Sequence, residues 1–182
     1  MRYTKTAVTL HWTIVLAIVT AASVGLYMTG LPFSPQKLKL YSWHKWIGVT
    51  IFLLAVARVV WRLMRAAPRL PPAMLRWQRI AAMASHILLY VLVLVIPVSG
   101  WLMSSALGVK TVYLGVVPLP DLLAKNKALG DALKQVHASL NGTLAVVVLL
   151  HAAAALKHHF VERDDVLHRM LPLIKPRDQA QR

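Results

Sequence analysis

The chain has 182 residues, of which 58% are hydrophobic and only 15% are charged, and it contains no cysteine. This composition is typical of an integral membrane protein and excludes a soluble domain with a polar shell. Without cysteine, the chain can form no disulfide, no thiolate-ligated iron–sulfur cluster and no covalent c-type haem link. A net charge of +15 would suggest nucleic acid as the partner of a soluble chain, but here we interpret it as charge that flanks membrane spans, so no nucleic-acid binding is expected.

Acidic residues are few, and none lies in a strongly apolar segment. They are Asp121, Asp131, Glu162, Asp164, Asp165 and Asp178. A carboxylate-bridged pair of metal ions, or an acidic proton pathway through a membrane, is therefore not expected. The sequence also contains no glycine-rich phosphate loop, no serine–histidine–aspartate set and no HExxH motif.

Four apolar segments are long enough to cross a membrane as helices, for which about 20 residues are needed. They cover approximately residues 7–29, 43–63, 80–106 and 137–157. Pro97 is expected to kink the third of them. The sequence therefore predicts an all-α integral membrane protein, a four-helix bundle formed by a single domain over residues 1–182.

The first apolar segment has some features of a signal peptide. Arg2 and Lys5 precede it, and the sequence Val19-Thr20-Ala21 resembles a cleavage site. The apolar run continues well past that point, however, so a retained first span is the favoured interpretation.

Charge outside the spans predicts the orientation of the chain. The N-terminus, the connector RLMRAAPRLPPAMLRWQR and the tail after the fourth span share one side of the membrane, and they hold every arginine except Arg58. By the positive-inside rule this side is the cytoplasm, so both termini are expected there.

Seven lysines lie on the opposite side, where topology requires no positive charge. They are Lys37, Lys39, Lys45, Lys110, Lys125, Lys127 and Lys134, and only Asp121 and Asp131 oppose them. These lysines are either scattered solubilising groups or the source of a field that attracts an anion or an acidic partner. The same side contains the long connector of residues 107–136, in which VYLGVVPLP is expected at the membrane interface and DLLAKNKALGDALKQ is expected to be helical.

Four histidines occupy matched positions in the expected spans. His137 and His151 are fourteen residues apart in the fourth span, which places them about 21 Å apart along a helix and within about 40° of one face. His11 opens the first span on the cytoplasmic side, and His44 opens the second span on the outer side. The bundle can therefore pair His44 with His137 near the outer surface and His11 with His151 near the cytoplasm.

Two histidine pairs at two depths are what two six-coordinate b-type haems require. Imidazoles on both faces of a porphyrin leave its iron no open site for oxygen chemistry, so such a centre passes electrons. The expected bundle thus encloses two non-covalent haems b, with His11, His151, His44 and His137 as metal ligands. The alternative is that each histidine is a hydrogen-bonding group between helices. Zinc or copper would need three or four ligands at one point, which these separated pairs do not offer.

Two arginines and two further histidines are candidate cofactor-binding residues near the inner pair. Arg58 lies fourteen residues after His44 and could bind a haem propionate, with Arg62 one turn further on, although both could instead reach the interface. His86 and His158 could replace an inner ligand, or could supply the hydrogen-bond donor and proton source that a quinone needs. Interfacial histidines without a role are the alternative.

Some remaining residues have weaker interpretations. Asn141, one turn after His137, could bond an outer propionate or a neighbouring helix. His159 and His168 are expected at the surface.

Several of these stretches together resemble bacterial cytochrome b561. They are LHW at residues 10–12, WHKWIG with Arg58 downstream, SHILLYVLVLVIPVSGW, the His137/His151 spacing, and LLHAAAALKHHF followed by DDVLHRMLP. The resemblance covers nearly the whole chain, and the family is similar in layout to the cytochrome b subunits of membrane formate dehydrogenases and nickel–iron hydrogenases. It implies a multi-pass protein of the bacterial inner membrane with two b haems that exchange electrons with ubiquinone.

The resemblance also implies residue roles and an activity. His11 and His151 carry over as ligands of the inner haem, and His44 and His137 as ligands of the outer haem. The family includes a superoxide oxidase, so we expect a superoxide:ubiquinone oxidoreductase with quinone near His86 and His158. A lysine-rich periplasmic rim would attract the superoxide anion. It consists of Lys37, Lys39, Lys45, Lys127 and Lys134.

Two other functions remain open from the sequence. One is a cytochrome b anchor subunit that passes electrons between a periplasmic redox protein and the quinone pool. The other is a haem-free transporter or structural bundle whose histidines serve packing.

Overall fold

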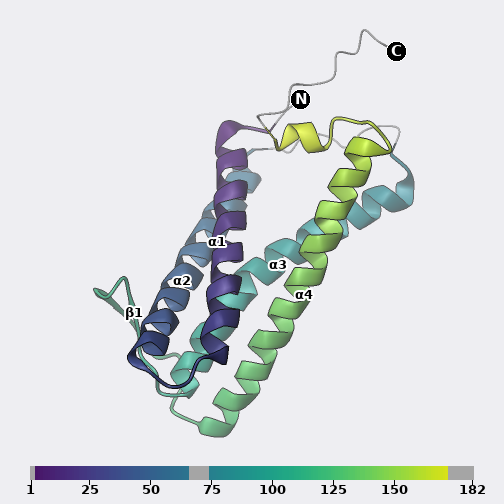
Figure 1. Cartoon of the computed structure of the whole chain (residues 1–182). Coiled ribbons are helices and arrows are strands. Elements are labelled where there is room, and N and C mark those ends of the chain that lie inside the picture. Colours follow the sequence, from purple (N-terminus) through teal and green to yellow (C-terminus); the bar gives the residue numbers. More distant parts are fainter. Residues whose placement is uncertain (1–2, 66–73, 172–182) are drawn as a thin grey trace.

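The computed structural model describes residues 3–65 and 74–171, so Arg2, the middle of the connector after the second span, and the tail with Asp178 lie outside the described residues. It contains four long helices, a two-stranded hairpin and a short 3₁₀ helix (Figure 1). In chain order these are α1 (Lys5–Gly30), α2 (Pro35–Met64), α3 (Arg76–Ala106), β1 (Thr111–Tyr113), β2 (Val117–Leu119), α4 (Lys127–Phe160) and η1 (Leu167–Arg169).

Three of the four long helices, α1, α2 and α4, start at residues whose side chains cap them. The side chain of Thr4 accepts a hydrogen bond from the amide of Ala7, and Ser34 does the same for Lys37. Asn126 caps α4 by accepting from the amide of Leu129. Each cap satisfies an amide that has no partner within the first helical turn.

All four helices are long and apolar enough to cross a membrane. Many of their large apolar side chains are exposed, including Leu26 (78%), Leu63 (82%) and Leu149 (69%). Among the described residues, the buried apolar cluster between α3 and α4 is small and consists of Leu92, Ile96 and Leu144. This inverted distribution is expected when lipid, and not water, surrounds the helices.

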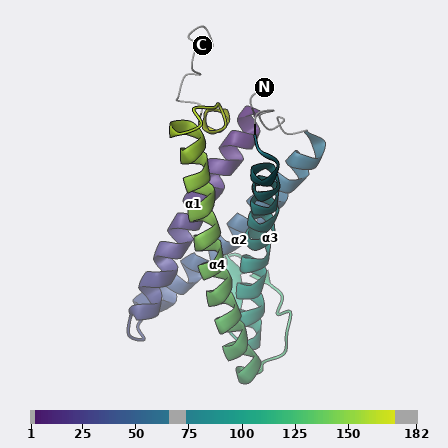
Figure 2. The same cartoon turned by 90° about the vertical axis from the view of Figure 1, so that its right-hand side faces the viewer.

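Two ends of the bundle can be distinguished (Figures 1 and 2). The start of α1, the end of α4 and η1 lie at one end, which we call the termini end. The α1–α2 turn, the β1–β2 hairpin and the start of α4 lie at the other, which we call the hairpin end.

Neighbouring helices in the sequence pack together, whereas α4 stands apart from two of its partners. α1 packs along α2, α2 along α3, and α3 along α4. Within the described ranges, the backbone of α4 is not in close contact with that of α1 or α2. Helices in direct contact have axes about 8–10 Å apart, so the spacing on this side of the bundle is unusually wide.

The β1–β2 hairpin departs from the expectation of purely helical structure. β1 and β2 are antiparallel, with Val112 opposite Pro118, and the turn places Leu114 (φ +53°) and Gly115 (φ +73°) in the left-handed region. Residues 111–120 do not continue α3 as a helix, because they are rich in β-branched residues and contain two prolines. α4 begins at Lys127, earlier than the expected apolar span, because polar helical turns extend the helix beyond it.

Gly130 sets how closely α4 approaches the end of α3. A Cβ atom at this buried position would lie 2.5 Å from Cδ2 of Leu107. We expect Gly130→Val to destabilise the protein by about 1–3 kcal/mol through overpacking, and so to lower its thermal midpoint in detergent by several degrees. Gly30→Val is the matched control, since a Cβ there meets nothing within 4 Å. Equal midpoints for the two variants would contradict this account of the junction.

Candidate functional site

His44 of α2 and His137 of α4 face each other near the hairpin end. Their ring centroids are 6.3 Å apart and the ring planes are inclined by 83°. The two residues come from helices without close backbone contact, so the imidazoles reach toward each other across the wide side of the bundle.

Hydrogen bonds fix the protonation of both rings at Nδ1. Nδ1 of His44 lies 3.0 Å from the carbonyl oxygen of Ala21, which can only accept, so the imidazole nitrogen must donate. Nδ1 of His137 lies 2.8 Å from Oγ of Ser99, and the Ser99 hydroxyl lies 2.7 Å from the carbonyl oxygen of Ile96. Because Ser99 has one proton and donates it to Ile96, Nδ1 of His137 must donate as well. A neutral ring protonated at Nδ1 has its lone pair at Nε2, the form that binds metal.

An apolar cavity lies between these two histidines. All four helices line it, with Ile18, Ala21, Ala22, His44, Gly48, Ile51, Val93, Ile96, Pro97, His137, Asn141 and Leu144. Two glycines support the rings from behind: a Cβ on Gly25 would lie 3.1 Å from Cε1 of His44, and a Cβ on Gly100 would lie 3.1 Å from Cε1 of His137. Gly48, in contrast, faces open space within the cavity. The site thus combines two imidazoles with the apolar walls that a flat macrocycle requires.

A second group of histidines lies toward the termini end. The rings of His86 in α3 and His151 in α4 are 5.2 Å apart and inclined by 74°. His11 in α1 is near enough to both to interact with them electrostatically. The structure therefore brings three histidines to this level, where the sequence pairing named two ligands and left His86 as a neighbour.

Arg58 joins three helices at the same level. Its Nη1 donates to the carbonyl oxygen of Ala7 in α1 over 2.8 Å, and its guanidinium lies 5.8 Å from the ring centre of Tyr90 in α3. Arg62 is close enough to His86 for electrostatic interaction. Asn141 donates to the carbonyl oxygen of His137 over 2.7 Å within its own helix, so its amide is engaged in a local contact.

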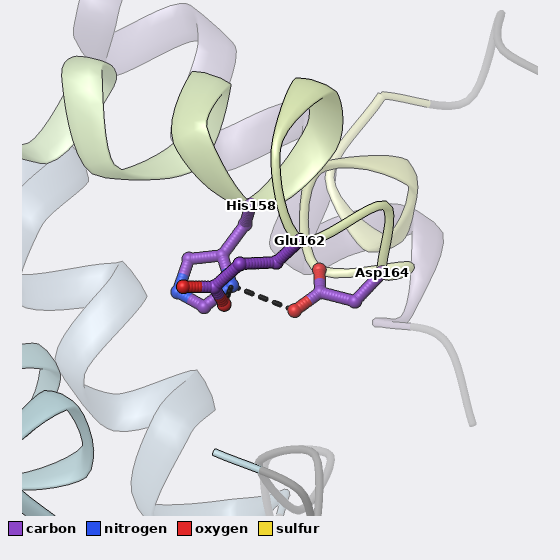
Figure 3. Close-up of side chains that lie close together, drawn as sticks. All are labelled: His158, Glu162 and Asp164. Atoms are coloured by element: carbon purple, nitrogen blue, oxygen red, sulfur yellow. Dashed lines mark hydrogen bonds and ion pairs between the residues drawn. The ribbon is translucent and has the colours of Figure 1, made fainter. Parts of the chain in front are cut away.

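His158 belongs to a separate polar cluster at the termini end (Figure 3). Its Nδ1 lies 2.8 Å from Oε2 of Glu162 and 2.6 Å from Oδ2 of Asp164. Oε1 of Glu162 also accepts from Nζ of Lys157 and from Nε2 of Gln78 in α3, each over 2.8 Å. The bond from Lys157, supported by the charge of His158, lowers the pKa of the Glu162 carboxyl below its usual value.

These contacts determine what the cluster can do. The three acidic or imidazole groups are close enough to hold a metal ion, but Lys157 and His158 already contact the two carboxylates. The arrangement is therefore an ion-pair network at the end of the α3–α4 seam. His158 lies seven residues after His151, about 10 Å further along α4, so the structure does not bring it into contact with the inner histidines.

The expectation that His159 and His168 lie at the surface is wrong for His168, which is only 6% exposed. Its ring lies 5.0 Å from that of His159, and Nδ1 of each ring is buried without a hydrogen-bond partner among the described residues. The cause is η1, which folds back over the end of α4 and is tied to α1 by the bond from Trp12 Nε1 to the carbonyl oxygen of Met170 (2.8 Å). A sequence pattern for an apolar span gives no signal of such a return.

The lysines of the hairpin end differ in how their ammonium groups are held. Lys45 donates to the carbonyl oxygens of Val109 (3.1 Å) and Lys110 (3.3 Å), and Lys37 donates to that of Leu31 (2.6 Å). Lys127 forms an ion pair with Asp131, whereas Lys39 lies over the ring of Trp43. The positive side chains gather at this end of the bundle, but some of them also have structural roles there.

Comparison with known proteins identifies relatives over almost the full length. A protein of Escherichia coli (strain K12) named cytochrome b561 homolog 2 is 33% identical over 171 residues, which cover 93% of this chain and 91% of the relative. Cytochrome b561 homolog 1 of the same organism is 28% identical over 172 residues, covering 94% and 97%. A protein of Yersinia pestis named probable superoxide oxidase CybB is 29% identical over 175 residues, covering 94% and 96%.

The family assignment rests on a match along almost the whole chain and not on a single motif. Residues 2–173 match the family described as prokaryotic cytochrome b561, whose members are membrane electron-transfer proteins that hold haem b. The chain therefore belongs to the prokaryotic cytochrome b561 family.

Proposed function

We propose that this chain is a superoxide:ubiquinone oxidoreductase that holds two haems b, with the hairpin end in the periplasm and the termini end in the cytoplasm of a bacterial inner membrane. The observation that carries the proposal is the arrangement of histidines on α4. His137 and His151 lie on one face at two depths, and each has histidine neighbours from other helices.

The outer pair fits a bis-histidine iron site. A metal–imidazole bond is about 2 Å long and the ring centre lies about 1 Å beyond the nitrogen, so two imidazoles that held one iron between them would have ring centroids about 6 Å apart. The observed separation is 6.3 Å, and both rings have their Nε2 lone pairs available. When bound, haem supplies one-electron redox chemistry, and the chain supplies ligation, spacing and field.

For the inner site we propose His11 and His151 as ligands, with His86 beside them. Arg58 lies at this depth and supports the assignment, because a guanidinium held between α1, α2 and α3 is suited to a propionate. Arg62, one turn nearer the cytoplasm, is the second candidate for this contact.

Ligand substitution tests these assignments by haem stoichiometry and reduced-minus-oxidised spectra. We expect the wild type to hold two haems per chain, and His137→Ala and His151→Ala each to retain no more than one. His11→Ala should lose a haem, whereas His86→Ala should retain both. A wild type without haem would overturn the proposal, and two haems in His11→Ala with one in His86→Ala would exchange those two roles.

Ser99 has a role that can be tested without measuring turnover. Ser99 accepts a hydrogen bond from Nδ1 of His137. Loss of this bond in Ser99→Ala should make Nε2 a weaker electron-pair donor to iron and reduce affinity for the outer haem by about 10–100-fold. The midpoint potential of one haem should rise while that of the other stays constant. Ser99→Thr is the matched control, since it keeps the hydroxyl. Identical potentials in Ser99→Ala and the wild type would contradict the role.

The proposed electron donor rests on charge and on a relative's name. Superoxide is an anion, and the lysines at the hairpin end create a positive field there that would raise its local concentration. The Yersinia pestis relative is named a probable superoxide oxidase, and the match covers 94% of the present chain.

Neutralising exposed lysines tests the steering. Lys39→Gln combined with Lys134→Gln should slow haem reduction by superoxide several-fold at low salt, and the difference should disappear at high salt because ions screen the field. Lys5→Gln, at the other end of the bundle, is the control and should leave the rate unchanged. Haems that stay oxidised in superoxide, but accept electrons from a co-purifying periplasmic protein, would favour the anchor-subunit function.

The proposed electron acceptor is ubiquinone near His86 and His158. Two superoxide ions supply two electrons and become two molecules of oxygen, and quinone takes up these electrons with two protons to form quinol. Glu162 and Asp164 are partly exposed and hydrogen-bond His158, so this cluster is suited to deliver the protons from water at the termini end.

A further inference from the structure

We infer that the β1–β2 hairpin is inserted into the lipid interface at the hairpin end, where it anchors the long connector between α3 and α4. The hairpin is uncharged and mostly apolar: no charged residue occurs from Thr111 to Pro120. Its side chains are nevertheless exposed, with Leu114 at 57%, Val116 at 79% and Val117 at 51%. An apolar surface of this kind requires a partner that is not water.

Tryptophan side chains mark the level of the membrane surface. Trp43, Trp46 and Trp101 all lie near the hairpin end, as expected for an aromatic belt at a membrane interface. Trp46 donates to the carbonyl oxygen of Val112 over 2.7 Å, and Trp101 donates to that of Pro120 over 3.0 Å. The hairpin is therefore hydrogen-bonded to two tryptophans of the belt, one at β1 and one just after β2.

The hairpin also extends below this level, toward the middle of the bundle. The hydroxyl of Tyr113 lies 3.0 Å from Oγ1 of Thr50. Thr50 is one turn beyond Trp46 in α2, about 6 Å deeper in the direction of the membrane centre. Figure 1 shows the hairpin beside α2 at the outside of the bundle, and β1 also contacts α3, so its outer face lies where lipid would surround the bundle.

The backbone of the hairpin is adapted to such a position. β1 and β2 pair over three residues each, and the turn is closed by the bond from the amide of Val116 to the carbonyl oxygen of Tyr113 (3.1 Å). The carbonyl oxygen of Val112 accepts a hydrogen bond from Trp46 Nε1. Satisfied backbone groups lower the cost of moving a segment out of water.

Lipid is the occupant that these contacts favour. The exposed face of the hairpin continues the lipid-facing surface of α2, on which Leu53 is 54% exposed just beyond Thr50. An anchored hairpin would also fix the connector before it, where Lys45 binds the carbonyl oxygens of Val109 and Lys110. The insertion would thereby hold the connector and Lys45 in place.

The absence of cysteine makes a direct experiment possible, because a single introduced cysteine takes a spin label at one site. We would label Val116→Cys in proteoliposomes and measure collision rates with oxygen, which concentrates in lipid, and with a water-soluble nickel chelate. Leu149→Cys on the exposed face of α4 is the lipid control, and Asp121→Cys, just after the hairpin, is the aqueous control.

We expect the Val116 label to resemble the Leu149 label, with oxygen collisions several-fold above those with nickel. A label that resembles the Asp121 label would overturn the inference. Low collision rates with both reagents would also overturn it, since they would place a second copy or another protein on the hairpin.

A second variant tests the same inference within a labelled protein. In Leu114→Cys carrying the label, Val116→Asp should move the label toward the aqueous pattern, because a carboxylate is costly to insert. The haem spectrum reports separately that the protein is intact. An unchanged label environment in an intact protein would contradict lipid insertion.

Discussion

The proposed outer ligand pair depends on two hydrogen bonds, in which Nδ1 of His44 and Nδ1 of His137 each donate to an acceptor on another helix. The acceptors differ, a backbone carbonyl in α1 for one ring and a serine hydroxyl in α3 for the other, yet they have the same consequence. Each ring is oriented by a helix other than its own, and both residues line the cavity between the helices. Without these bonds an imidazole on a helix could rotate and exchange tautomers, and a pair of ligands with the correct spacing would not be defined in advance.

From the sequence, the depths of the histidines along their helices were predictable, but their hydrogen-bond partners were not. Since His137 and His151 lie within one apolar span, the geometry of a helix alone places them on one face at two depths. The roles of Ser99 and Ala21 had no such signal, because a serine in α3 and a backbone carbonyl in α1 become partners only when the helices pack. Glu162 and Asp164 were missed for a related reason. Their i+4 and i+6 spacing from His158 is visible in the sequence, but Asp164 joins the cluster only because the chain turns back after α4.

The basic side chains at the two ends of the bundle contact different kinds of groups. At the termini end, Arg58 and Lys157 are bonded to a carbonyl and to a carboxylate, and they contribute to helix packing. At the hairpin end, Lys45 and Lys37 hold backbone carbonyls while keeping their charge. A lysine can therefore stabilise a loop and contribute to the electrostatic field at once, since hydrogen bonds to neutral carbonyls leave the net charge unchanged. Counting lysines in the sequence could give the sign of that field, but it could not separate these roles.

Because α4 lies apart from α1 and α2, the proposed haems would also contribute to the stability of the fold. α4 packs along α3 and carries one histidine of each proposed pair, while its ligating partners would come from α1 and α2, which it does not approach closely within the described chain. Groups bound between these histidines would join helices that otherwise have little direct contact. A ligand that binds the folded state and not the unfolded chain stabilises the fold by its own binding free energy. With haems bound as proposed, the wide side of the bundle would be both the electron path and the place where cofactor binding stabilises the fold. Assembly of the bundle and binding of its cofactors would then be coupled.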